Sequence, residues 1–292
     1  MIDVSPQKRR RVSVKGLLHS LAFIIIALTI AAFWFDFYVM YFSTSEYDYA
    51  PTAEDGTEVF SYAGCNVAGV IFHGTLQTYA YFDPETETGD DVASSEDIVY
   101  YIDLAEDEPD VKAILLEIDS YGGTPVAGEE VANALKRATK PTVVQIREAG
   151  DSAAYWVASA GDIIFASELS DVGGIGVTQS YIDESKLNEK EGYTFNQLST
   201  GKFKDILNPE KPLTAEERQL LERDLKIAHD AFVKAVSENR TLDINKVKAL
   251  ADGSSMLGGM VLENGLIDRI GGFDEVETYL AELIGEEPNI CW

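Results

Sequence analysis

The residue best suited to chemistry in this chain is Ser152, in the segment 150–156 (GDSAAYW). The apolar run 142–146, typical of a buried strand, precedes the segment, and a helix is expected to begin within it. A serine in such a strand-to-helix turn presents its hydroxyl at the start of the helix, where the nucleophiles of many hydrolases lie. Serine at this position is more often only a helix cap, so the position alone does not establish catalysis.

A nucleophilic serine needs a base that accepts its proton. The histidines are His19, His73 and His229, of which His73 is the best candidate, although a structural role suits it better. The segment 201–205 (GKFKD) offers lysine instead, and burial in an apolar pocket lets a lysine lose its proton near neutral pH. Most lysines are solvated surface charges, so Lys204 alone is weak evidence. Together, the serine and this segment favour a Ser/Lys hydrolase.

Two glycine-rich turns complete the set of candidate residues. Gly122 and Gly123 follow the apolar run 111–118, as expected for a tight turn or for backbone N–H groups directed at an oxyanion. The turn 173–176 (GGIG) matches neither a P-loop nor the G-x-G-x-x-G pattern, so turn geometry explains it better than nucleotide binding. Ser120 competes with Ser152 as a nucleophile, but its hydroxyl is better placed to brace the first turn.

The N-terminus predicts a membrane anchor. Residues 16–35 carry no charge and, at about 1.5 Å per residue, span about one bilayer core. Basic residues precede this span and aromatic residues follow it, which predicts a cytoplasmic N-terminus and a body outside the membrane. A cleaved signal peptide is the alternative, but its apolar region is usually shorter and ends at a small-residue cleavage site. We expect a basic tail at 1–15, an anchor at 16–42, an acidic stalk at 43–62 and a catalytic domain at 63–292.

The composition narrows the functional classes. The formal net charge is −27, and an acidic body repels nucleic acid, so we expect no nucleic-acid partner. Hydrophobic residues make up 46% of the chain, enough for a large core. Cys65 and Cys291 pair if the body is exported, and two unpaired thiols are at least as plausible. Their spacing does not suggest a metal site, and we expect neither a metal nor a cofactor.

Apolar runs and helical patterns alternate along the body. Such alternation predicts repeated β-α-β units around a mainly parallel sheet, an α/β fold. The expected strands are 67–72, 111–118, 142–146, 163–166 and 193–198. A long helix over 214–238 starts with a capping box formed by Thr214 and Glu217, and shorter helices are expected at 244–250 and 273–283.

The ordered motifs of the body resemble the signal peptide peptidase A family of membrane-anchored Ser/Lys peptidases. The resemblance runs from about residue 67 to 283 and implies a fold of the crotonase and Clp-protease type, with C-terminal helices. The motifs that carry it are 118–123 (IDSYGG), 152–156 (SAAYW), 171–177 (DVGGIGV), 201–206 (GKFKDI), 251–253 (ADG) and 264–268 (NGLID). Their order is far more specific than any one of them.

The resemblance implies a role for each matching residue. Ser152 is the nucleophile, and Lys204 rather than Lys202 is the general base. The oxyanion hole consists of the backbone N–H groups of Gly122 or Gly123 and of Ala153. The family assembles into rings or domes whose sites form at subunit contacts, so the resemblance also implies a homo-oligomer.

The chain departs from the family pattern at several positions around the site. Tyr121 stands where the family usually has Pro, the pair 153–154 (AA) where it has Gly-Gly, and Asp151 where it commonly has Ala. Gly174 stands where the family commonly has a serine whose hydroxyl bonds the lysine. Here water or another hydroxyl would have to orient the lysine.

The sequence therefore predicts a membrane-bound serine endopeptidase. Its expected partners are hydrophobic peptides, such as cleaved signal peptides at the outer membrane face, and membrane lipid around one anchor. One alternative is a catalytically weak or inactive peptide-binding scaffold of the same fold, which the Gly174 departure favours. The other is a crotonase-type acyl-CoA enzyme, against which the acidic body counts because it has no obvious basic patch for the CoA phosphates.

Overall fold

The computed structural model describes residues 60–80 and 91–292. The predicted tail and anchor, and most of the predicted stalk, lie outside the described residues. None of the helices in the described part of the chain has both the length and the hydropathy that a bilayer crossing requires.

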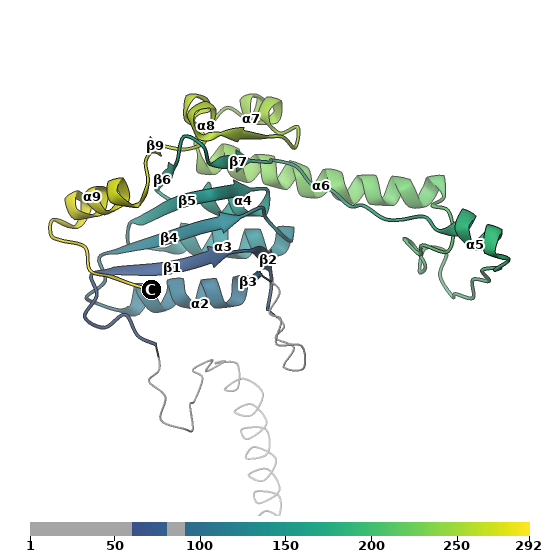
Figure 1. Ribbon diagram of the computed structural model, residues 1–292, viewed down its shortest axis with the longest axis horizontal. Coiled ribbons are helices and arrows are strands. Elements are labelled where there is room, and N and C mark those ends of the chain that lie inside the picture. The colour runs from purple at the N-terminus through teal and green to yellow at the C-terminus, as the bar shows by residue number, and fades with distance from the viewer. Residues whose placement is uncertain (1–59, 81–90) are drawn as a thin grey trace, which may run out of the picture. The chain divides into compact units, whose positions relative to one another are not determined.

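The body is built on one main sheet whose strands run in the order β10-β1-β4-β5-β6-β9, all parallel along this path (Figure 1). β7 extends the sheet beside the end of β5, and β8 pairs with β7 in the antiparallel direction. The strands are β1 (Val67–His73), β4 (Ala113–Ser120), β5 (Thr142–Asp151), β6 (Ile163–Ala166), β7 (Asp171–Gly173), β8 (Ser255–Leu257), β9 (Arg269–Ile270) and β10 (Ile290–Cys291). The predicted α/β fold with a mainly parallel sheet is confirmed.

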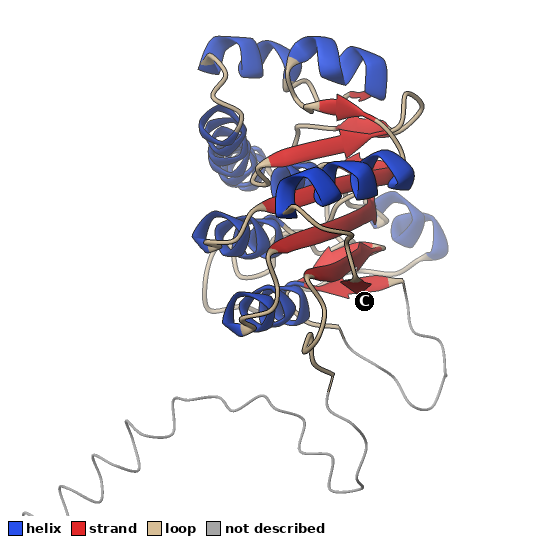
Figure 2. Ribbon diagram, turned by 90° about the vertical axis from the view of Figure 1, so that its left-hand side faces the viewer, coloured by secondary structure: helices blue, strands red, loops and turns tan. Residues whose placement is uncertain are grey.

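Helices cover both faces of this sheet, which is why its central strands read as unbroken apolar runs. Along β1, Ala68 and Val70 join the larger core cluster with α2 (Ser95–Asp107) and α3 (Pro125–Arg137). Val67 points to the other face, where α9 (Phe273–Ile284) packs. Figure 2 shows several helices stacked on one face and α9 crossing the opposite one.

The remaining elements are a two-stranded sheet and further helices. β2 (Thr75–Gln77) and β3 (Val92–Ser94) form a small parallel pair. The Ser94 hydroxyl accepts a hydrogen bond from the Asp97 N–H at 3.2 Å and caps α2. The other helices are α4 (Ala153–Ala158), α5 (Ser185–Glu191), α6 (Ala215–Asn239), α7 (Ile244–Leu250) and α8 (Gly258–Asn264).

The segment between β7 and α6 contains the one expected strand that does not form. Residues 193–198 have no strand structure and are exposed, Leu198 at 97%. Figure 1 places this segment, with α5, around the N-terminal end of α6 and away from the main sheet. A strand needs a neighbouring strand to pair its N–H and C=O groups, so apolar residues alone do not produce one.

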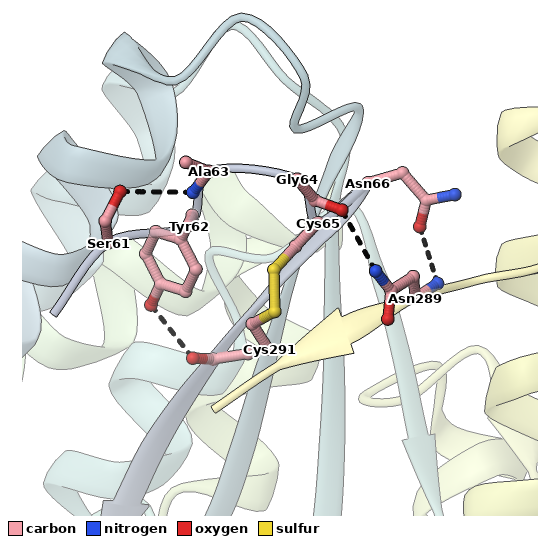
Figure 3. Close-up of a disulfide and its surroundings, with 9 residues drawn as sticks. Ser61, Tyr62, Ala63, Gly64, Cys65, Asn66, Asn289 and Cys291 are labelled. Carbon is pink, nitrogen blue, oxygen red and sulfur yellow. Dashed lines mark hydrogen bonds between the residues drawn. A yellow bond between two sulfur atoms is a disulfide. The ribbon is translucent and has the colours of Figure 1, made fainter.

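A disulfide between Cys65 and Cys291 joins the start of the described body to β10 (Figure 3). Cys291 pairs in register with Ala68 of β1, so the bridge holds the edge of the sheet together. Around it, the Tyr62 hydroxyl donates to the Gly69 carbonyl at 2.9 Å, and the Asn289 side chain donates to the Gly64 carbonyl at 3.0 Å. Of the two possibilities left open by the sequence, the structure has the paired one.

Candidate functional site

Ser152 lies in a strained turn between β5 and α4. Its backbone has φ 55° and ψ −124°, a conformation that costs a non-glycine residue about 1–3 kcal/mol. The Ser152 N–H donates to the Gly173 carbonyl at 2.9 Å, and the Ser152 carbonyl accepts from the Trp156 N–H at 3.0 Å. The Ser152 side chain makes no capping hydrogen bond. The hydroxyl is therefore not engaged as the helix cap that position alone favoured.

The Gly-Gly turn after β4 lies directly against this serine. A Cβ built on Gly122 would lie 2.7 Å from the Ser152 Cβ and 3.0 Å from the Ala153 nitrogen. The backbone at Gly122 has φ +109°, in the left-handed region that favours glycine. The fold thus brings Ser152, Ala153 and the Gly-Gly turn together from two neighbouring strand ends, as the sequence predicted.

The hydrogen bonds within the turn distinguish the backbone N–H groups of the two glycines. The Gly122 N–H donates to the Ser120 Oγ at 3.0 Å, and the Ser120 hydroxyl in turn donates to the Gly74 carbonyl at 2.5 Å. Ser120 therefore braces the turn, as expected for it. Because the Gly122 N–H is already donated, Gly123 is the better candidate for an oxyanion donor beside Ala153.

Ser152 opens into a cavity of about 640 Å³. Gly123 and Ala153 line it on the side of Ser152, and Trp156 and Phe232 form an apolar wall, their rings stacked at 5.0 Å with an interplanar angle of 8°. This wall joins α4 to the C-terminal part of the distant helix α6, a contact that no local sequence pattern predicts. A cavity of this size holds several side chains of a peptide.

Asp151 directly precedes Ser152 in the sequence, and it is buried. Burial, and then the negative charge of Asp171 on β7, raise the pKa of Asp151 to about 6. Its Oδ1 atom is buried and has no hydrogen-bond partner among the described residues. From the sequence, Asp151 was notable only because it departs from the family pattern. Its negatively charged neighbour Asp171 lies on β7, so this environment appears only in the fold.

The two described histidines have separate surroundings. His73 Nε2 lies 2.9 Å from the Glu117 Oε1 on the neighbouring strand, and His73 does not line the Ser152 cavity. His229 does line the cavity, with its Nε2 3.0 Å from the Ala251 carbonyl oxygen. His229 was not predicted to line the cavity. It lies one helical turn before Phe232 on α6, so the two side chains share a helix face, and this spacing could have indicated its position.

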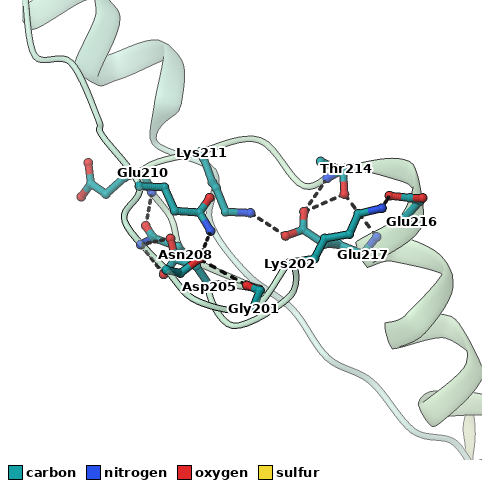
Figure 4. Close-up of polar contacts among 11 residues, drawn as sticks. Gly201, Lys202, Asp205, Asn208, Glu210, Lys211, Thr214, Glu216 and Glu217 are labelled. Atoms are coloured by element: carbon teal, nitrogen blue, oxygen red, sulfur yellow. Dashed lines mark hydrogen bonds and ion pairs between the residues drawn. The ribbon is translucent and has the colours of Figure 1, made fainter.

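Lys204 lies in the exposed segment before α6 and does not line the Ser152 cavity. Its neighbour Lys202 forms an ion pair with Glu216 (Figure 4). Within one copy of the chain, the fold therefore assembles the predicted nucleophile and oxyanion donors but not the predicted base. The role of Lys204 stays a prediction.

A polar network fixes the segment that carries Lys204 to the start of α6. Lys211 Nζ donates to Glu217 Oε1 at 2.6 Å, and the Thr214 hydroxyl and N–H donate to Glu217 Oε2 at 2.8 and 2.9 Å, which completes the predicted capping box (Figure 4). These bonds, that of Lys211 first, lower the pKa of Glu217 to about 2. The end of the segment is therefore anchored, although Lys204 itself is exposed.

Comparisons with known proteins identify the class. The model of peptidase family S49 matches residues 134–286, a stretch that includes Ser152 and Lys204. A relative from Methanocaldococcus jannaschii, named as a protease, is 34% identical over 233 residues, which cover 78% of this chain and 74% of the relative. Protease 4 of Haemophilus influenzae is 28% identical over 77% of this chain, and the chloroplastic serine protease SPPA of Arabidopsis thaliana is 30% identical over 61%.

The chain therefore belongs to peptidase family S49, the family of signal peptide peptidase A and Protease 4, and the expected family is confirmed. It spans about a third of the length of Protease 4 and about a quarter of the chloroplastic enzyme, at 35% and 27%. Among solved structures, a point mutant of ClpP1 from Listeria monocytogenes aligns over 70% of this chain and 92% of its own, with 13% identity and a TM-score of 0.44.

Proposed function

We propose that this protein is a membrane-bound serine endopeptidase in which Ser152 is the nucleophile and Lys204 the general base. The observation that carries the proposal is the strained Ser152 turn, whose hydroxyl is free of a capping bond and opens into a cavity beside the Gly-Gly turn. We also propose that the fold is of the crotonase and Clp-protease type and that one transmembrane helix precedes it.

The proposed reaction is an acyl transfer in two steps. The Ser152 Oγ attacks the peptide carbonyl carbon while the Lys204 amine takes its proton, and the N–H groups of Gly123 and Ala153 hold the developing oxyanion. The ammonium then gives this proton to the departing amine as the C–N bond breaks. Water, deprotonated by the same amine, hydrolyses the Ser152 ester and regenerates the free hydroxyl.

The base is proposed to come from a second copy of the chain. Two features support this: Lys204 does not line the cavity of its own copy, and the segment around it exposes large apolar side chains that suit an interface. The most exposed of these are Ile182 at 74%, Tyr193 at 71% and Leu198 at 97%. The active form would then be a homo-oligomer.

The walls of the cavity support the proposed substrate, and the disulfide supports the proposed location. Trp156 and Phe232 favour hydrophobic peptides, such as cleaved signal peptides, near the active serine. The bridge between Cys65 and Cys291 suits an oxidising compartment, which agrees with a body outside the cell membrane behind the predicted anchor. An anchored scaffold that binds peptides without cleaving them is the second candidate, favoured by the exposure of Lys204.

The decisive experiment mixes inactive copies. Ser152→Ala and Lys204→Ala proteins should each lack activity on a fluorogenic peptide. When co-assembled they should regain part of it, since sites that combine Ser152 of one copy with Lys204 of another stay complete. Lys202→Arg is the matched control and should remain active, whereas Lys204→Arg should not, because arginine does not deprotonate in this pH range.

A serine-directed phosphonate supplies a second readout that does not depend on turnover. It should label Ser152 in the wild-type protein and nothing in Ser152→Ala. Full activity of Ser152→Ala would refute the proposal outright. Inactive wild-type protein that still binds peptides would support the scaffold instead.

A further inference from the structure

Asp151 has a buried carboxyl beside Ser152 that takes no part in the proposed reaction. It ends β5, where it pairs with Gly173, and its side chain lines the Ser152 cavity while only 8% exposed. Its Oδ1 atom is buried and has no hydrogen-bond partner in the described part of the chain. A buried carboxyl oxygen without a partner is costly, so its presence beside the nucleophile needs a reason.

The carboxyl lies next to both the nucleophile and Gly174. A Cβ built on Gly174 would lie 3.2 Å from the Asp151 Oδ1 and 3.2 Å from the Ser152 nitrogen. The Asp151 Oδ1 and the Ser152 nitrogen therefore both lie beside the position that a side chain at residue 174 would occupy. A group that bonds this oxygen stands beside the nucleophile.

The surroundings of Asp151 lack a cation. The other titratable side chains that line the cavity in the described chain are Tyr121, His229 and Asp252, and no lysine or arginine lines it. His229 is bonded to a carbonyl, and Asp252 accepts two hydrogen bonds from Ser254. Asp171, on the adjacent strand, adds a second negative charge. An amine that enters this cavity therefore meets a carboxyl that no lysine or arginine of the described lining pairs with.

We propose that Asp151 is a positioning residue whose carboxyl accepts a hydrogen bond from the amine of the general-base lysine and so holds that amine beside the Ser152 hydroxyl. This inference rests on the proposed Ser/Lys function. It assigns to a carboxyl the orienting role that the sequence left to water or another hydroxyl. The neutral amine donates one N–H to Asp151, its lone pair takes the Ser152 proton, and the ammonium that results remains paired with the carboxylate.

A carboxylate partner has a measurable consequence. Because the lysine acts as a neutral amine, activity should rise with pH as the lysine loses its proton, and we call this part of the pH profile the rising limb. A negative charge favours the ammonium form, so it raises the pKa of the lysine and moves the rising limb to higher pH. Asp151→Asn keeps an acceptor oxygen but removes the charge. That variant should retain a kcat within about tenfold of the wild type, with its limb displaced by about one pH unit or more to lower pH.

Asp151→Ala removes the acceptor as well. It should lower kcat by about tenfold to a hundredfold with little change in KM, because the amine loses its orientation while the peptide still binds. The control is Asp119→Asn, at the end of the neighbouring strand and outside the Ser152 cavity. The Asp119 Oδ1 already accepts the Ala149 N–H at 3.2 Å, and this control should keep the wild-type limb.

The test measures kcat and KM from pH 6 to 10 on the full-length protein in detergent, after phosphonate labelling of Ser152 and inactivity of Lys204→Ala are established. If those two results fail, the proposed function fails. If they hold and the limb stays in place in Asp151→Asn, the role of Asp151 alone is overturned. A change in KM confined to peptides that contain lysine, absent for matched norleucine peptides, would assign Asp151 to the substrate and also overturn it.

Discussion

Removing the disulfide should destabilise the body by several kcal/mol. The bridge closes a loop between residues 226 apart in sequence, and the chain-entropy relation gives about 5 kcal/mol for a loop of that length. Unfolding entropy is about 2.1 cal/mol/K per residue, or about 0.5 kcal/mol/K for a body of about 230 residues, so Tm should fall by about 10 °C. The two-residue strand β10 should detach first, because it is short and lies at the edge of the sheet.

The assay compares the full chain with the Cys65→Ala/Cys291→Ala variant by thermal and urea unfolding, with and without a reducing agent. Reduction should lower the Tm of the wild-type protein toward that of the double variant and leave the variant unchanged. A difference in Tm below about 2 °C, or an equal response of both proteins to reduction, would refute the loop-closure argument.

Further predictions concern the turn, the core and the acid response. Gly122→Ala should abolish most peptidase activity while the far-ultraviolet circular dichroism persists, because the new Cβ would lie 2.7 Å from the Ser152 Cβ. Gly192→Ala, also at positive φ but facing open space, should keep its activity. Phe232→Ala should lower the free energy of unfolding by about 3–5 kcal/mol in urea titrations, since it leaves a cavity against Trp156. The lowered pKa of Glu217 stabilises the fold above its unfolded pKa, near 4.5, and this contribution is lost as pH falls toward about 2. The stability difference between wild type and Glu217→Gln should therefore shrink over that range, and a constant difference would contradict it.

The elements that the sequence predicted well are those fixed by local patterns. Apolar runs gave the central strands because a sheet covered on both faces needs apolar residues at every position. The capping box of α6 and the brace at Ser120 also depend on residues only a few positions apart. The strand expected at 193–198 failed because its apolar residues have no strand to pair with, which no local pattern reveals.

Only the part of the site that lies at the ends of strands was predicted from the sequence. Ser152 and the Gly-Gly turn follow adjacent parallel strands, so their proximity follows from the topology. The stacked wall and the place of His229 depend on where α6 crosses the body, and the state of Asp151 depends on β7. The pairing of Cys65 with Cys291 likewise depends on β10 returning to β1, which the spacing of two cysteines does not encode.

The left-handed backbone at residue 152 favours glycine for stability, whereas the proposed reaction requires serine. Glycine adopts φ 55° and ψ −124° without steric penalty, so Ser152→Gly should yield a protein that is inactive yet more stable by about 1 kcal/mol. Selection for folding alone would favour glycine here, and under the proposed mechanism selection for hydrolysis keeps the hydroxyl in place. Under the proposed mechanism, the same variant is the natural choice for trapping an uncleaved peptide, because it loses the oxygen proposed to attack and relaxes the turn that holds it.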